Sequence, residues 1–226
     1  KKFEKCYRQK MVSILTKYSP YYEKDMEDYD TEGEEDECEQ LMYALILSGL
    51  AMQMIGNSRP ASCAEHQVTH LWDMEVINGP LDALHGEKVS VAALLVLEEY
   101  KRIAAAITQG RCHAEPYENE DEELLKETFG KKGLLEEIRK ENEPELLETI
   151  SPQHLEKCLN GIEEIIDELP SEQTMFHLLE KAGCAKTVYD IGLDEAAVLP
   201  SLRLAPYTRR RLSLLRISKM LEIRGE

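Results

Sequence analysis

Three histidines lie close together in the segment from Gly56 to Val89. His66 and His70 are four residues apart and directly follow a helix-start signal, and His85 precedes a second one. Imidazole nitrogens bind divalent metals and carry protons near neutral pH. The segment therefore predicts either a metal site or an acid–base site at the start of two helices.

Local signals predict the helix that carries the first two histidines. Ser62 followed three residues later by Glu65 is a capping box, and Pro60 disfavours helical backbone at the residue before it. A helix is expected from Cys63 to a turn at residues 78–80, Asn-Gly-Pro. Because a helix repeats every 3.6 residues, both histidines fall on the same face.

The chain between the two helices is long enough to bring His85 beside His66. The eight residues from Ile77 to His85 can span roughly 26 Å when extended, whereas the helix rises about 17 Å from His66 to Ile77. Two neutral imidazoles near helix N-termini suit a divalent metal, because the helix dipole disfavours the protonated ring. A hydrogen-bonded histidine face without metal is the alternative. Asp73 lies on the same face but roughly 10 Å further along the axis, which weakens it as a third ligand.

Composition limits the classes of function. The 226 residues are 42% hydrophobic, enough to bury a sizeable core, and carry 44 acidic against 27 basic residues for a net charge of −17. This charge excludes nucleic acid and anionic membranes as expected partners. The six cysteines form no C-x-x-C pair and no signal peptide is visible, so reduced thiols and a cytoplasmic location are expected.

The periodicity of the chain is helical almost throughout. Residues 41–58 form the longest uncharged run, which is nearly long enough to span a membrane. Because polar residues interrupt it, the run predicts a buried core helix instead. The acidic segment 23–39 before it predicts a solvated loop. Further helices are expected from Val89 and over residues 154–169, 170–183 and 207–221. Strand alternation and a glycine-rich phosphate loop are both missing from the sequence. A single all-α domain, a helical bundle over residues 1–226, is the expected fold.

Three stretches carry a resemblance to a known family: SGLAMQMIGNSRPASCAEHQVTHLWDM, LHGEKV and LAPYTRRRLSLLRI. They resemble the C-terminal helical domain of the sn-glycerol-1-phosphate dehydrogenases, which are related to glycerol dehydrogenase, iron-containing alcohol dehydrogenases and dehydroquinate synthase. The resemblance covers most of the chain and is weakest in residues 23–39 and 111–150. It implies NAD(P)-dependent interconversion of dihydroxyacetone phosphate and sn-glycerol 1-phosphate.

The resemblance also assigns residues to roles. It implies that His66 and His85 hold a divalent metal together with an aspartate, with zinc expected and nickel or iron as alternatives. His70 corresponds to a position beside the substrate, with a proton-relay role. Four polar residues border the same site and are expected to bind the phosphate of a small phosphorylated substrate: Asn57, Ser58, Arg59 and Lys88.

The sequence departs from the family pattern in three respects. Cys63 replaces a glycine, and residues 209–213 read Arg-Arg-Arg-Leu-Ser where Arg-Asp-Arg-Tyr-Thr is usual. The α/β dinucleotide-binding domain, followed in the family by the aspartate ligand, is absent from these 226 residues, so this chain alone is expected to be inactive. A noncatalytic helical interaction module and a stand-alone metal-binding helical protein are the alternatives, and a homo-oligomer is compatible with each.

Overall fold

The computed structural model describes residues 31–58 and 61–225, and the side chains of 42–58 and 61–225. The chain divides into two compact units, residues 1–63 and residues 64–226. The expectation of one domain over the whole chain stays a prediction.

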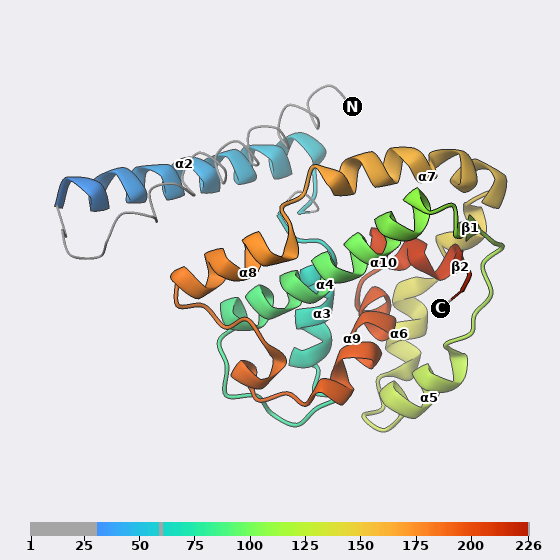
Figure 1. The fold of residues 1–226 in the computed structure, drawn as a ribbon. Coiled ribbons are helices and arrows are strands. Elements are labelled where there is room, and N and C mark those ends of the chain that lie inside the picture. The colour runs from blue at the N-terminus through green and yellow to red at the C-terminus, as the bar shows by residue number, and fades with distance from the viewer. Residues whose placement is uncertain (1–30, 59–60, 226) are drawn as a thin grey trace. The chain divides into compact units, whose positions relative to one another are not determined.

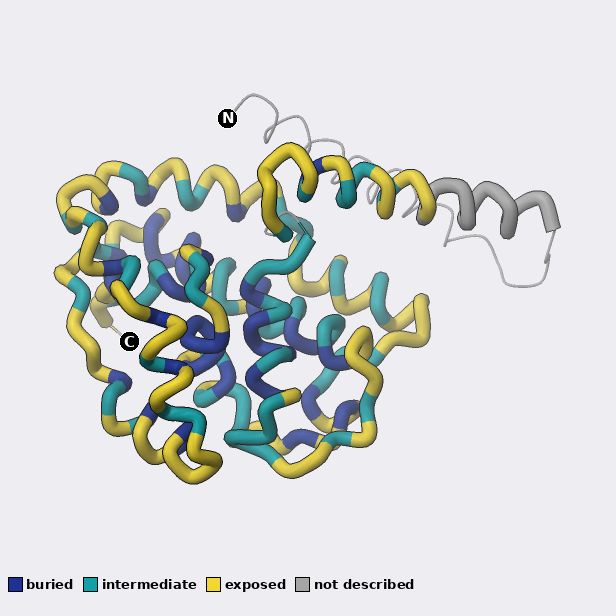
Figure 2. Tube along the Cα trace, turned by 180° about the vertical axis from the view of Figure 1, so that it is seen from behind, coloured by how far each residue is buried: buried dark blue, intermediate teal, exposed yellow. Residues whose placement is uncertain are grey.

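The first unit contains helix α2, Thr31–Ile55. The helix expected in residues 41–58 is confirmed, but it begins earlier, so residues 31–39 are helical and not part of a loop. Residues 23–30 of the acidic segment lie outside the described part. Many residues of this helix are exposed (Figure 2), among them the large apolar residues Met42, Leu45, Ile46 and Met54. The expected burial of this helix stays a prediction. Across the described residues, no helix is both long and apolar enough to cross a bilayer.

The second unit confirms the all-α prediction (Figure 1). Its α-helices are α3 (Ala64–Asp73), α4 (His85–Thr108), α5 (Glu122–Gly130), α6 (Leu135–Asn142), α7 (Pro152–Asp167), α8 (Glu172–Lys181), α9 (Val198–Leu204) and α10 (Leu214–Ile217). Short 3₁₀ turns join them at η2 (Leu147–Thr149), η3 (Val188–Ile191), η4 (Glu195–Ala197), η5 (Ala205–Thr208) and η6 (Ser218–Met220). A small antiparallel sheet pairs β1 (Cys112–Ala114) with β2 (Leu221–Ile223). Three residues are too few to show strand alternation, so the sequence did not reveal this sheet.

The core forms where α3 packs between α4, α9 and η5. The inner face of α3 carries Val68, Leu71 and Trp72, all fully buried. The Trp72 indole Nε1 donates a hydrogen bond to Ser201 Oγ on α9 at 2.7 Å, so its polar group is satisfied inside the core. With the inner face buried, the outer face of α3 is left to carry His66 and the residues that follow it at helical spacing.

The ends of the two site helices differ from the sequence expectation. α3 ends at Asp73, five residues before the predicted turn, because Glu75 has a left-handed backbone with φ of 53° and Asn78 Nδ2 donates to the Trp72 carbonyl at 3.2 Å. α4 begins at His85 and not at Val89. The early start places His85 itself in the first turn.

The C-terminal segment is the clearest error in the helix predictions. Residues 207–221 do not form one helix, because Arg209 is extended, with φ of −148° and ψ of 134°, and Ser213 caps a new helix, α10. By contrast, α7 and α8 each begin within two residues of the predicted start. Ser151 and Ser171 each accept a hydrogen bond from the backbone N–H three residues further on.

Candidate metal and substrate site

The start of α4 and the outer face of α3 bring three histidines together. The ring centroids of His66 and His85 are 5.8 Å apart, and those of His70 and His85 are also 5.8 Å apart. The prediction that the loop returns His85 to the side of His66 is confirmed. His85 therefore lies at the centre of the cluster, with one α3 histidine on each side.

A carboxylate holds each of the two histidines implied as metal ligands. His66 Nδ1 lies 2.8 Å from Glu65 Oε1, and His85 Nδ1 lies 3.2 Å from Asp73 Oδ2. A carboxylate acceptor favours the neutral tautomer with hydrogen on Nδ1, which leaves Nε2 with a lone pair that can bind a metal. This carboxylate–histidine arrangement is the usual support for metal-binding imidazoles.

Lys88 fixes the position and charge of Asp73. Its Nζ donates to Asp73 Oδ1 at 2.6 Å, while the other carboxylate oxygen faces His85. Burial alone would raise the pKa of Asp73, but the hydrogen bonds from Lys88 and His85 outweigh it and hold that pKa below its ordinary value. Asp73 is therefore an ionised orienting group for His85. The substrate-binding role expected of Lys88 stays a prediction.

His70 is kept in its uncharged form. Burial lowers the pKa of its ring, and the nearby positive charge of Arg209 lowers it further. Because the ordinary histidine pKa is about 6.5, His70 is mostly neutral at pH 7. A neutral imidazole has one N–H and one free lone pair, so it can pass a proton to or from a bound molecule.

The spacing of His66 and His85 is compatible with two ligands of one metal ion. Two imidazoles bound to one ion at about 2.0–2.1 Å have ring centroids on the order of 5–6 Å apart, which fits His66 and His85. Among the described residues, no group of three or more histidine, cysteine, aspartate or glutamate side chains is placed to hold a metal ion. The cluster thus fits two ligands of the set that the resemblance implies, and the third must come from elsewhere.

The remaining residues expected at the site lie in the other unit or outside the described part. Asn57 and Ser58 belong to the unit of residues 1–63, and Arg59 lies outside the described residues. Their substrate-binding role stays a prediction. Sequence reasoning also missed two residues here: Glu65 was assigned only to the helix cap, although its position next to His66 is a visible signal, and Arg209 was noted only as part of an unusual motif.

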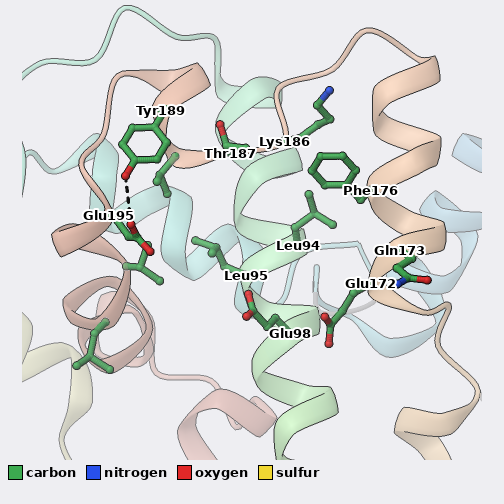
Figure 3. Close-up of a pocket in the computed structure, with 13 residues that line it drawn as sticks. Leu94, Leu95, Glu98, Glu172, Gln173, Phe176, Lys186, Thr187, Tyr189 and Glu195 are labelled. Carbon is green, nitrogen blue, oxygen red and sulfur yellow. Dashed lines mark hydrogen bonds between the residues drawn. The ribbon is translucent and has the colours of Figure 1, made fainter.

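A cavity lies away from the histidines. A groove of about 790 Å³ runs between α4, α8, η3 and α9, with Leu94, Leu95 and Phe176 among its apolar lining residues (Figure 3). Tyr189 donates a hydrogen bond to Glu195 across one end at 3.2 Å. None of the three histidines lines this groove, so it is separate from the candidate site.

The fold and the cluster define an all-α protein segment with a carboxylate-supported histidine site at the start of two helices. Comparison with curated proteins then finds similar sequences in one group of enzymes. The chain is 29% identical over 172 residues to a glycerol-1-phosphate dehydrogenase [NAD(P)+] of Geobacillus thermodenitrificans and 30% identical over 172 residues to that of Geobacillus stearothermophilus. It is 31% identical over 176 residues to that of Halalkalibacterium halodurans. These alignments cover 76–77% of the chain and confirm the resemblance seen in the sequence.

The similarity covers only part of each relative. The chain spans about a third of the length of these relatives, 35% of the first two and 36% of the third. No family model matches the chain, and no solved structure matches it.

Proposed function

We propose that this chain forms the metal- and substrate-binding helical part of an NAD(P)-linked dehydrogenase that interconverts dihydroxyacetone phosphate and sn-glycerol 1-phosphate. The observation that carries the proposal is the meeting of His66, His70 and His85, two of them held by carboxylates, in a chain whose relatives are named for this activity. The reaction needs a polarised carbonyl, a proton donor and a hydride donor, and the cluster suits the first two.

The residues that would hold a divalent metal are His66 and His85, through Nε2, with an aspartate from the rest of the protein. Zinc is the expected ion, with nickel or iron as alternatives, because imidazole and carboxylate ligands admit all three. A bound metal would polarise the substrate carbonyl as a Lewis acid. The nicotinamide cofactor would be bound mainly by parts of the protein beyond the described residues.

The chain's own side chains would orient the imidazoles and transfer the proton. Glu65 and Asp73 orient the two imidazoles, and Lys88 holds Asp73 in its charged form. His70, neutral at pH 7, acts as a proton relay: one ring nitrogen gives its proton to the carbonyl oxygen as hydride arrives, while the other takes up a proton from solvent, and both transfers reverse in the oxidation. Asn57, Ser58 and Arg59 remain proposed phosphate contacts.

The two alternatives make different demands on the same residues. A noncatalytic interaction module would not require an Nδ1-bound carboxylate on both imidazoles, so the observed pairs favour the enzyme. A stand-alone metal-binding protein would need a third ligand from within the chain. Metal content and turnover, measured on the same variants, separate the three.

The test uses the full-length protein with His66→Ala, His85→Ala and His70→Ala, and with His177→Ala, an exposed histidine on α8, as control. We expect the first two variants to lose metal and turnover together, because metal ligands set affinity. His70→Ala should keep its metal and lose about 10²- to 10⁴-fold in kcat, the usual contribution of a general acid. Metal is measured by mass spectrometry and turnover with dihydroxyacetone phosphate and NADH or NADPH. Full metal in His85→Ala would overturn the assignment.

A further inference from the structure

The charge of the substrate raises a question that the histidines do not answer. A phosphate monoester carries about −1.5 to −2 charges at pH 7 and is best bound by guanidinium groups or by lysine. Lys88, the lysine beside the cluster, is buried, and its Nζ donates to Asp73 at 2.6 Å. Lys88 is therefore already engaged by Asp73, and Arg59, the other cation expected at the phosphate, lies outside the described residues.

Arg209 is a cation that forms no ion pair with the described residues of the cluster. Its side chain is exposed, and among the described side chains, those of residues 42–58 and 61–225, its guanidinium forms neither a hydrogen bond nor an ion pair. The neighbouring Arg210 differs, because its Nε donates to the Pro144 carbonyl at 2.8 Å and is directed to another part of the fold. The Arg209 backbone lies against the histidine helix, because its carbonyl accepts a hydrogen bond from Gln67, the residue after His66.

The backbone of Arg209 is fixed to the histidine helix by a buried glutamine. Gln67, adjacent to His66 on α3, is 1% exposed and its Nε2 donates to the Arg209 carbonyl at 3.2 Å. Its Oε1 accepts from Ser213 Oγ at 2.8 Å, and its own carbonyl accepts from Thr208 Oγ1 at 3.3 Å. These bonds join the segment 208–213 to α3 on both sides of Arg209. The position of Arg209 relative to the histidines is therefore set by the core and not by a free loop.

We propose that Arg209 is the specificity-determining residue of this site: its guanidinium binds the phosphate of a phosphorylated ketone, while the histidines act on the carbonyl. Gln67 is the positioning residue that holds it there. This inference rests on the proposed function for its substrate. A guanidinium presents paired N–H donors that match two phosphate oxygens, so both charge and geometry favour this ligand.

The first test compares two ketones in the full-length protein. Arg209→Gln should lower kcat/KM for dihydroxyacetone phosphate on the order of 10–100-fold, mainly through KM, since hydrogen bonds to a charged group contribute about 1.5–3 kcal/mol. The kcat/KM for unphosphorylated dihydroxyacetone and the metal content should stay unchanged. The kcat/KM of Arg209→Lys for dihydroxyacetone phosphate should lie between those of wild type and Arg209→Gln, because lysine keeps the charge without the paired donors. Arg224→Gln, an exposed arginine beside β2, is the control.

The outcomes distinguish the two proposals. An equal loss for both ketones, or no loss for either, overturns the role of Arg209. If the wild-type protein reduces neither ketone, the proposed function fails. The anion site is then tested with inorganic phosphate, followed by NMR of the His70 ring: a shift in wild type that disappears in Arg209→Gln supports the site, and identical spectra overturn it.

Gln67→Met tests the positioning role with nearly unchanged side-chain volume. It should reproduce the selective rise in KM for the phosphorylated ketone, with a smaller effect than Arg209→Gln. A purely structural role would lower the melting temperature or affect both ketones equally, and either result without the selective KM change would overturn the positioning role.

Discussion

Asp73 and Asp121 make similar contacts in very different surroundings. Asp73 is bound by Lys88 and His85, and its side chain is 35% exposed. Asp121 is bound by Lys219, Arg203 and the Tyr207 hydroxyl, the last at 2.9 Å, and its side chain is 6% exposed. The same type of ion pair therefore occurs once at the rim of the histidine cluster and once inside the fold.

The difference in exposure distinguishes a structural ion cluster at Asp121 from a candidate binding site at Asp73. Every oxygen of Asp121 is bound by protein groups, and its partners come from α9, η5 and η6, so the cluster ties the C-terminal segment to the start of α5. Asp73 holds His85, whose side chain is half exposed and whose Nε2 forms no hydrogen bond with any of the described side chains. Saturated charges stabilise a fold, whereas partly open ones can bind a ligand.

The largest effect on stability is expected from Asp121→Asn. Removing one partner of a buried ion pair leaves the other charge without compensation, and the Lys219 side chain is only 13% exposed. We expect a loss of about 3–5 kcal/mol in the free energy of unfolding. Urea unfolding followed by circular dichroism measures it, with Glu118→Gln, an exposed carboxyl nearby, as control. A loss no larger than that of the control would show that the cluster does not stabilise the fold.

A second prediction concerns how the stabilisation by the Asp121 cluster depends on pH. Burial alone would raise the pKa of Asp121, but Lys219, Arg203 and Tyr207 outweigh it and hold the pKa below its ordinary value near 3.8. Between the folded pKa and the ordinary value, the unfolded chain binds more protons than the folded one, so the free energy of unfolding falls as the pH falls. The stability difference between wild type and Asp121→Asn should be constant above pH 5 and shrink as the pH falls below 3.8 through the folded pKa. A difference that stays constant down to pH 2 would contradict the assignment of this charge.

How far the sequence predicted these two clusters depends on the separation of their residues. Local signals located α8 through Ser171, and the capping box at Ser62 placed the start of α3 within one residue of its observed start. The end of α3 was wrong because the left-handed turn at Glu75 has no local signal. The Asp121 cluster was not predicted, since its basic partners lie 82 and 98 residues further along the chain.

The same limit applies to the candidate site. The meeting of His66 with His85 was predicted because a short loop allows it. The contact between Gln67 and the Arg209 carbonyl was not predicted, because 142 residues separate them. Spacing can show which residues of neighbouring helices share a face. It cannot show which distant segment packs over that face, because that depends on the whole core.

The smallest effect on stability is expected from Asp73→Asn. The Asp73 side chain is 35% exposed, against 6% for Asp121, and its partner His85 is 50% exposed. The Lys88 side chain is only 11% exposed, but in Asp73→Asn the amide oxygen can still accept its hydrogen bond. Ion pairs at such positions contribute about 0–1 kcal/mol, so the free energy of unfolding should change by no more than that. Urea unfolding under the conditions used for Asp121→Asn makes the two values directly comparable. A loss as large as that of Asp121→Asn would mean that Asp73 and Lys88 form part of the scaffold, and the distinction between the two aspartates would fail.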